Sequence, residues 1–130
     1  MKKQKTLRQL KDQCWKVFSE WIRRSHADEG GTVECWSCRQ LIFWKDAHAG
    51  HFVAGRTNAV LFDERIVKPQ CPRCNIFLGG NYAAYTLRML DDHGREKVDE
   101  FLALKHQTIK FTRSDLEEKI AYYKQKLESL

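Results

Sequence analysis

Apolar residues recur at spacings of three and four along residues 6–27, with basic residues between them. This period is typical of an amphipathic helix that buries one face. The apolar positions are Leu7, Leu10, Cys14, Val17, Phe18, Trp21 and Ile22. Cys14 lies on this stripe, so we interpret its thiol as a small buried apolar group rather than as a metal ligand. The glycine-containing run at residues 28–31 then ends the helix.

The middle of the chain changes to short apolar runs separated by turn residues. Residues 59–62 are such a run, and residues 47–54 alternate small and larger side chains. Short segments of this kind, bounded by glycine and polar residues, are typical of β-strands. We therefore predict a β-hairpin whose first arm, residues 47–54, carries His51 near its end and whose returning arm is residues 59–62. A helix is expected to begin at Asn75.

The last third of the chain returns to the helical period, and residues 94–105 predict one helix. Ser114 is expected to cap a final helix, with Glu117 at the capping-box position. The apolar stripe of that helix is Leu116, Ile120, Tyr123, Leu127 and Leu130. We expect the stripe to pack against the N-terminal helix, and a seam between two copies of the chain is the alternative.

The length of 130 residues suits a single domain, residues 1–130. Lys and Arg number 23 against 17 Asp and Glu, a formal net charge of +6. This bias suits a polyanionic partner, and a soluble basic protein without one explains it equally well. No apolar run reaches the about 18–20 residues of a membrane span, and no apolar segment follows the basic N-terminus. We expect a soluble intracellular protein with no membrane contact.

Four of the five cysteines form two C-x2-C pairs, Cys35 with Cys38 and Cys71 with Cys74. Two such pairs can converge on one Zn²⁺ as a closed tetrahedral site. A closed site has no open coordination position, so this zinc is expected to hold the fold and to do no chemistry. Disulfide frameworks are not usually spaced in this way, so the pattern favours a reducing compartment.

The two cysteine pairs bracket the predicted hairpin, which carries a histidine, and a helix that begins with an asparagine. This is the layout of a ββα-metal nuclease site. Hydrolysis of a phosphodiester needs a base that activates water and a divalent cation that neutralises charge on the phosphorane. A neutral His51 can take the proton of the water, and an amide or carboxylate oxygen can hold a hard cation such as Mg²⁺.

Taken together, these segments resemble the HNH endonucleases and, more narrowly, the NinG (Rap) recombination proteins of lambdoid phages. Beside the cysteine pairs, the similarity is carried by AGHF at 49–52, LFDER at 61–65, QC at 70–71, Asn75, GGN at 79–81, Tyr85 and Arg88. It covers about residues 33–100 and excludes the terminal helices. It implies an α+β fold with a zinc-stapled ββα-metal (HNH or treble-clef-like) core at residues 33–92. The helices that the apolar period predicts at 6–27 and 94–130 are expected to flank this core.

The resemblance also implies roles for single residues. His51 takes the first HNH position and is the expected general base, with a structural histidine as the alternative. Asn75 takes the last position and is the expected ligand of a catalytic Mg²⁺ or Mn²⁺, with a helix N-cap as the alternative. Glu64 is a further candidate ligand of that ion. Asn81 is expected to cap the helix.

Two positions depart from the HNH pattern. Ile66 stands where the motif has an asparagine that braces the hairpin loop. Gly50 stands immediately before the expected base, where many HNH enzymes carry a metal ligand, although the NinG-like pattern shares this glycine. A replacement ligand is expected from His48, Asp63 or Glu64, and the sequence does not choose among them.

Five basic residues around the hairpin are candidate DNA contacts, with solvated surface charge as the alternative. They are Lys45, Arg56, Arg65, Lys68 and Arg73. These features predict a metal-dependent DNA endonuclease. The resemblance implies branched substrates such as Holliday junctions and D-loops, and the bacterial host cytoplasm as location if the protein is phage-encoded.

A homodimer is expected to suit a substrate with two-fold character, because it would present two sites symmetrically. Two other functions remain open from the sequence. One is a catalytically inactive, zinc-stabilised DNA-binding module, which Ile66 and Gly50 favour. The other is a protein-interaction zinc domain.

Overall fold

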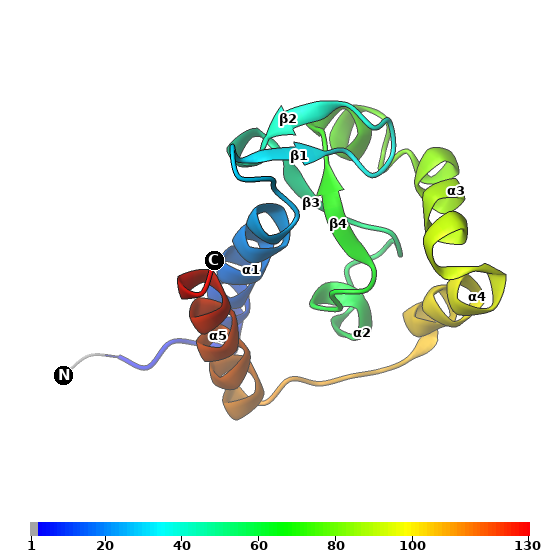
Figure 1. Ribbon diagram of the computed structural model, residues 1–130. Helices are drawn as coiled ribbons and strands as arrows, with labels where there is room; N and C mark the ends of the chain where they lie inside the picture. The colour runs from blue at the N-terminus through cyan, green and yellow to red at the C-terminus, as the bar shows by residue number, and fades with distance from the viewer. Residues whose placement is uncertain (1–2) are drawn as a thin grey trace.

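The computed structural model describes residues 3–130 and combines helices with two small antiparallel sheets (Figure 1). The elements are α1 (Leu7–Ser25), β1 (Thr32–Glu34), β2 (Leu41–Phe43), the 3-10 turn η1 (Trp44–Asp46), β3 (His48–His51), α2 (Asn58–Leu61), β4 (Val67–Gln70), the π-helical turn η2 (Arg73–Phe77), α3 (Tyr82–His93), α4 (Arg95–Ala103), the 3-10 turn η3 (Leu104–His106) and α5 (Arg113–Glu128). In Figure 1, α1 and α5 lie on one side, α3 and α4 lie on the other, and the strands and α2 lie between. The predicted mixture of helices and a small β component is confirmed.

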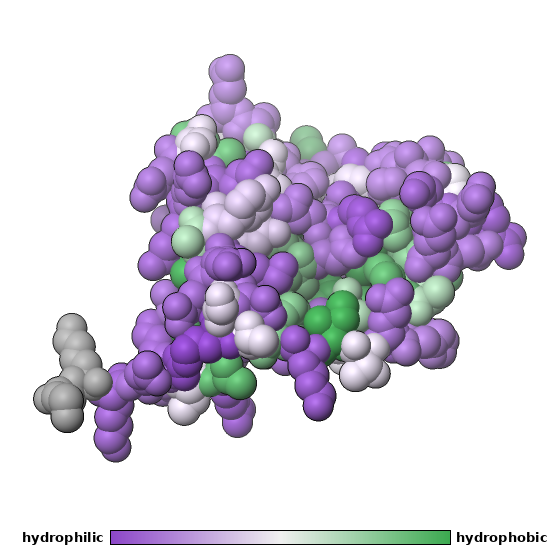
Figure 2. All heavy atoms as spheres, turned by 90° about the horizontal axis from the view of Figure 1, so that it is seen from below, coloured by the Kyte–Doolittle hydropathy of each residue, from purple (hydrophilic) through white to green (hydrophobic). Residues whose placement is uncertain are grey.

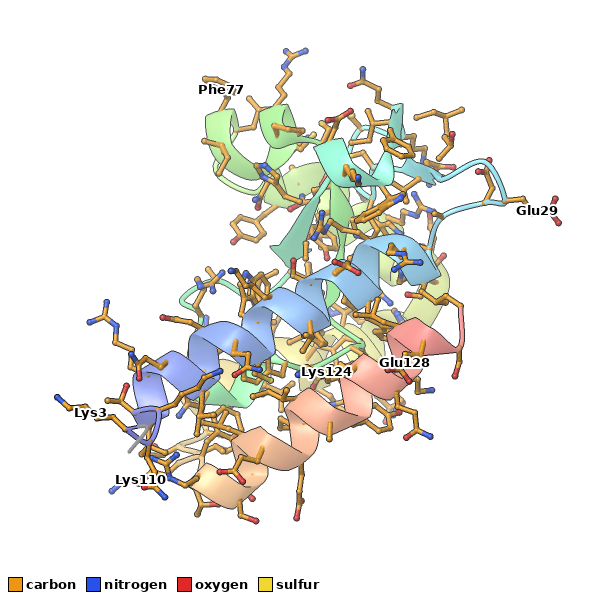
Figure 3. The ribbon with its side chains drawn as sticks, turned by 90° about the vertical axis from the view of Figure 1, so that its left-hand side faces the viewer. Lys3, Glu29, Phe77, Lys110, Lys124 and Glu128 are labelled. Carbon is orange, nitrogen blue, oxygen red and sulfur yellow. The ribbon has the colours of Figure 1, made fainter. Side chains whose placement is uncertain are left out.

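The terminal helices form one half of the core. α1 begins with a capping box in which Thr6 and Gln9 exchange hydrogen bonds of 3.1 and 2.9 Å. Its buried face consists of Leu10, Cys14, Phe18 and Ile22. This face packs against Leu116, Ile120 and Tyr123 of α5, and the two helices run side by side in the same direction (Figure 3). The predicted packing of the C-terminal stripe on the N-terminal helix is confirmed, as is the burial of Cys14.

The start of α5 differs from the prediction. Thr112, not Ser114, is the N-cap residue, and Asp115 rather than Glu117 completes the capping box, with hydrogen bonds of 3.0 and 2.9 Å. Both pairs fit the same spacing of a hydroxyl and a carboxylate. Capping by Thr112 and Asp115 starts the helix two residues earlier than capping by Ser114 would, and the longer helix has more backbone hydrogen bonds.

The strands form two separate hairpins. β1 pairs with β2, with Thr32 opposite Phe43, and β3 pairs with β4, with His48 opposite Gln70. The predicted returning arm at residues 59–62 is wrong, because these residues belong mostly to α2 and the returning strand is β4. The amides of residues 60 and 61 bond back to the carbonyl of Thr57 at 3.0 and 2.9 Å, which closes a helical turn.

A second apolar cluster fills the space between the β3–β4 hairpin and the helices α3 and α4. It consists of Phe52, Val53, Val60, Ile66, Tyr85, Met89, Val98 and Phe101. Ile66 is fully buried there, and its carbonyl accepts a 2.8 Å hydrogen bond from the amide of Phe52. Apolar packing therefore braces the hairpin loop at the position where the HNH motif uses an asparagine. Within residues 3–130, no helix combines the length and apolar character that a membrane span requires.

Candidate metal centre and catalytic site

The four paired cysteines converge at one end of the two hairpins. Cys35 follows β1, Cys38 lies in the β1–β2 turn, Cys71 follows β4 and Cys74 lies in η2. Their sulfur atoms all lie within 4.8 Å of one another, and the Cys38 and Cys71 sulfurs are 3.7 Å apart. Zinc–sulfur bonds of about 2.3 Å in a tetrahedron would separate the sulfurs by about 3.8 Å. The predicted cluster is therefore formed, with a geometry that can hold a structural Zn²⁺.

Hydrogen bonds from the surrounding chain prepare these sulfurs to bind a cation. The amides of Ser37 and Cys74 donate to the sulfurs of Cys35 and Cys71 at 3.4 and 3.5 Å. Burial raises the pKa of the Cys35 thiol, but hydrogen bonds from backbone amides and from Cys38 outweigh burial and lower this pKa to about 7. Burial raises the pKa of Cys74, and the neighbouring sulfurs of Cys71, Cys38 and Cys35 raise it further, to about 12. A divalent cation at the centre would favour the charged form of all four sulfurs.

Asn81 supports this cluster rather than the helix after it. It occupies the N-cap position of α3 with φ 44°, but its side chain makes no capping hydrogen bond. Its amide nitrogen instead donates to the sulfur of Cys74 at 3.4 Å. The predicted capping role of the Asn81 side chain is therefore wrong.

A buried glutamine ties the cysteine cluster to the β3–β4 hairpin. The amide nitrogen of Gln70, which is fully buried, donates to Ser37 Oγ and to the Gly80 carbonyl, both at 2.8 Å. A Cβ atom on Gly50 would lie 1.8 Å from Gln70 Oε1, so the Gln70 side chain would have to move. The Tyr85 hydroxyl donates to the Gly50 carbonyl at 2.9 Å. Gly50 is thus required by close packing, and that packing leaves no room for a metal-binding side chain at this position.

His51, the predicted base, is the last residue of β3 and is 8 % exposed. Its ring stacks on Trp15 of α1, with centroids 5.1 Å apart and planes 18° from parallel. Nε2 lies 3.1 Å from the Leu61 carbonyl oxygen. A carbonyl can only accept, so Nε2 carries the hydrogen and a neutral ring keeps a lone pair on Nδ1. Burial lowers the pKa of His51; the Leu61 carbonyl opposes this effect and Arg56 adds to it, so the neutral form is favoured.

Asn75, the predicted metal ligand, lies in η2 instead of beginning a long helix, because the α-helix starts only at Tyr82. Its side-chain amide lies 3.0 Å from Nδ1 of His48. Side chains alternate across a strand, so His48 and Gly50 share one face of β3 while His51 faces α1. The structure therefore brings Asn75 together with His48, and it gives His51 different neighbours.

Glu64 and Asp63, in the loop between β3 and β4, contact other residues than Asn75. The Tyr123 hydroxyl of α5 donates to Glu64 at 2.8 Å. Both oxygens of Asp63 accept from the Arg65 guanidinium, at 2.9 and 2.7 Å. Both carboxylates are already partnered, so of the three proposed replacement ligands only His48 contacts Asn75.

The five basic candidates for DNA contact occupy different environments. Arg56 and Arg73 are exposed, and the Arg56 guanidinium lies 4.5 Å from the centre of the Trp15 ring. Lys45 is also exposed, whereas Arg65 is engaged by Asp63 as described. Lys68 is half-buried, with its ammonium group 4.8 Å from the centre of the Trp36 ring, and burial lowers its pKa.

Two residues that shape this site, Trp15 and Gln70, were missed by reasoning from the sequence. Trp15 looked like one more position near the apolar stripe of α1, yet its ring supports His51 and Arg56. Gln70 appeared only beside a cysteine pair, yet it joins the cluster to the hairpin. Both roles depend on segments that meet only in the folded chain.

The whole chain, residues 1–130, matches the family described as bacteriophage lambda NinG protein. It is 32 % identical over 124 residues to protein NinG of Escherichia phage 933W, an alignment that covers 91 % of this chain and 56 % of the relative. It is 31 % identical over 124 residues to protein NinG of Escherichia phage lambda, covering 91 % of this chain and 55 % of the relative. The chain thus spans about half the length of these relatives. No solved structure matches it. The chain belongs to the NinG family.

Proposed function

We propose that the chain is a metal-dependent DNA endonuclease that hydrolyses phosphodiester bonds in branched recombination intermediates. The observation that carries this proposal is the state of His51. Its ring is neutral and oriented, with Nε2 engaged by Leu61 and a lone pair on Nδ1. These are the properties of a general base that takes a proton from water at neutral pH.

The His48–Asn75 pair supports a place for the catalytic cation. Octahedral ligands at about 2.1 Å from Mg²⁺ or Mn²⁺ lie about 3.0 Å apart when adjacent. The Asn75 amide and His48 Nδ1 have this separation, 3.0 Å. Rotation of the amide by 180° would present its oxygen in place of its nitrogen. Asn75 and His48 would then hold the ion, which would neutralise charge on the phosphate.

Nicking of supercoiled plasmid tests this proposal. Zinc-loaded wild type is expected to nick in Mn²⁺ or Mg²⁺, and His48→Ala and Asn75→Ala are each expected to reduce the rate at least tenfold. Lys97→Gln, an exposed change on α4, is the matched control and should leave the rate unchanged. Full activity of both ligand variants would remove the proposed cation site.

A zinc-stabilised DNA-binding module without catalysis is the second candidate. One observation favours it: Asn75 contacts His48, whereas the His51 ring packs against α1. On this alternative, DNA binding is insensitive to Mg²⁺ and Mn²⁺, and no divalent cation supports cleavage by folded, zinc-loaded protein.

A further inference from the structure

A cavity of about 690 Å³ lies beside His51, between the N-terminal half of α1, the loop before α2 and the segment that leads into α5. Trp15 and Leu61, which contact His51, both line it. The Asn58 side chain donates to the Ile109 carbonyl at 2.9 Å, which fixes the segment before α5 against α2. The volume is within the about 300–1,000 Å³ typical of sites that enclose a small ligand.

The cavity is lined by positive charge. Arg8, Lys11, Arg56 and Lys110 line it, and the only carboxylate among its lining residues is Asp12. Arg56 has φ 50°, a left-handed conformation that is uncommon outside glycine, and its guanidinium is held against Trp15. Figure 3 shows Lys110 beside the N-terminal end of α1, where Lys3 also lies. The charge is therefore concentrated at one end of the helix pair and suits an anion.

The same cavity offers flat apolar surface. Phe111 and Trp15 line it with their rings partly exposed, and Leu7, also a lining residue, is 49 % exposed. Figure 2 views the face along which the connection from α4 to α5 runs, and an apolar patch interrupts its mostly hydrophilic surface. Cations that follow a backbone, combined with rings that stack on bases, are the features that bind single-stranded nucleic acid.

We propose that this cavity holds one unpaired nucleotide of a DNA strand, with its base against Phe111 and its phosphates on Arg56 and the neighbouring cations. A paired base would not present its face to the ring, so the cavity selects a strand that is open next to His51. This inference rests on DNA being the ligand of the proposed function, and it is independent of whether the protein cleaves DNA.

The test is fluorescence anisotropy of zinc-loaded full chain with no added Mg²⁺ or Mn²⁺. The probes are a labelled single strand of about 12 nucleotides and a blunt duplex of equal length. Phe111→Leu keeps apolar volume and removes the flat ring. It is expected to weaken binding to the single strand at least fivefold, while binding to the duplex and the salt dependence stay unchanged.

Two charge variants complete the experiment. Arg8→Gln with Lys110→Gln removes two exposed charges at the cavity and should lower the slope of log affinity against log salt by about 1.4. Arg95→Gln with Lys97→Gln makes the same charge change on α4, across the molecule (Figure 1), and should leave the slope within error of wild type.

Each other outcome overturns the inference. One such outcome is that wild type has no affinity for the single strand, and another is that Phe111→Leu keeps its single-strand affinity. A third is that the two double charge variants lower the salt slope equally. Plasmid nicking measured beside the anisotropy separates this failure from that of the nuclease. Single-strand binding without plasmid nicking would leave the cavity assignment intact and contradict the nuclease. Plasmid nicking together with unchanged single-strand affinity of Phe111→Leu would contradict the cavity assignment and leave the nuclease intact.

Discussion

Replacement of Gly50 by alanine tests the close packing of Gly50 against the side chain of Gln70. The added methyl group would meet Gln70 Oε1 at 1.8 Å, and Gln70 can withdraw only by breaking its bonds to Ser37 and Gly80. Overpacking of a buried site costs about 1–3 kcal/mol, and each of the two hydrogen bonds contributes about 1 kcal/mol. Reduced freedom of the unfolded chain returns about 0.5–1 kcal/mol. We expect Gly50→Ala to lower the free energy of unfolding by about 3 kcal/mol.

The assay is urea unfolding of the zinc-loaded protein, followed by circular dichroism and tryptophan fluorescence. Gln70→Ala removes the obstacle but leaves Ser37 Oγ and the Gly80 carbonyl unpaired, so it is also expected to destabilise. Because the two side chains compete for one space, the double variant should lose about 2 kcal/mol less than the sum of the single losses. Gly30→Ala is the control, because a Cβ there would lie 3.5 Å from Asp28 Oδ1, an ordinary contact.

A free energy of unfolding of Gly50→Ala within about 1 kcal/mol of wild type, with an unchanged denaturant slope, would show that Gly50 is not required by close packing. Additive losses in the double variant would show the same, since they would mean that Gly50 and Gln70 do not compete. A loss of about 3 kcal/mol in the Gly30→Ala control would show that any added methyl group is harmful and would remove the special role of Gly50.

Three further predictions follow from single contacts. Tyr85→Phe leaves the Gly50 carbonyl without its 2.9 Å donor and should cost about 1–2 kcal/mol in urea unfolding; a cost below about 0.5 kcal/mol would argue against this contact. Cys38→Ser should lose stoichiometric zinc by atomic absorption and more than about 4 kcal/mol of stability, whereas Cys14→Ala should keep its zinc; full zinc in Cys38→Ser would contradict the cluster. The pKa of His51 lies below its ordinary 6.5, so the folded form binds its proton only at lower pH. The cleavage rate and the stability that His51 contributes should therefore both be at their full value above about pH 6.5 and should decrease as the pH falls below it. A cleavage rate that, on lowering the pH, already decreases before pH 7 is reached would contradict the assignment of His51 as the base.

Features encoded locally in the sequence were predictable. The stripe of α1 repeats once per helical turn, and its burial against α5 followed from two apolar faces that needed partners. Each C-x2-C turn holds its own two sulfurs close together, and the two pairs predicted one four-cysteine cluster because a shared Zn²⁺ would join them.

Features that depend on tertiary contacts were not predictable. Residues 59–62 have the composition of a strand, yet Val60 enters one apolar cluster while Leu61 and Phe62 enter the other, and a helical turn serves both. β4 was hidden because it carries Lys68 and Pro69, which are unusual in a strand. Pro69 is accommodated because each sheet has only two strands, and its carbonyl accepts a 2.9 Å hydrogen bond from Trp36.

The same limit applied to the candidate site. The spacing of His51 and Asn75 matched the HNH pattern, but spacing does not reveal which way a side chain leaves a four-residue strand. The alternation along β3 directs His51 toward Trp15 and His48 toward Asn75. Only the folded structure shows that, of the three candidates that the sequence allowed, His48 contacts Asn75.

The most direct test of the proposed nuclease activity is cleavage of a labelled four-way DNA junction by zinc-loaded protein in Mn²⁺ and in Mg²⁺. Linear duplex and single strand of matched sequence serve as competing substrates, and His51→Ala is compared with wild type. We expect metal-dependent incision near the branch point, faster than on either linear substrate, and a rate at least 100-fold lower in His51→Ala. Junction binding without incision by folded, zinc-loaded wild type, at any divalent cation, would contradict this expectation.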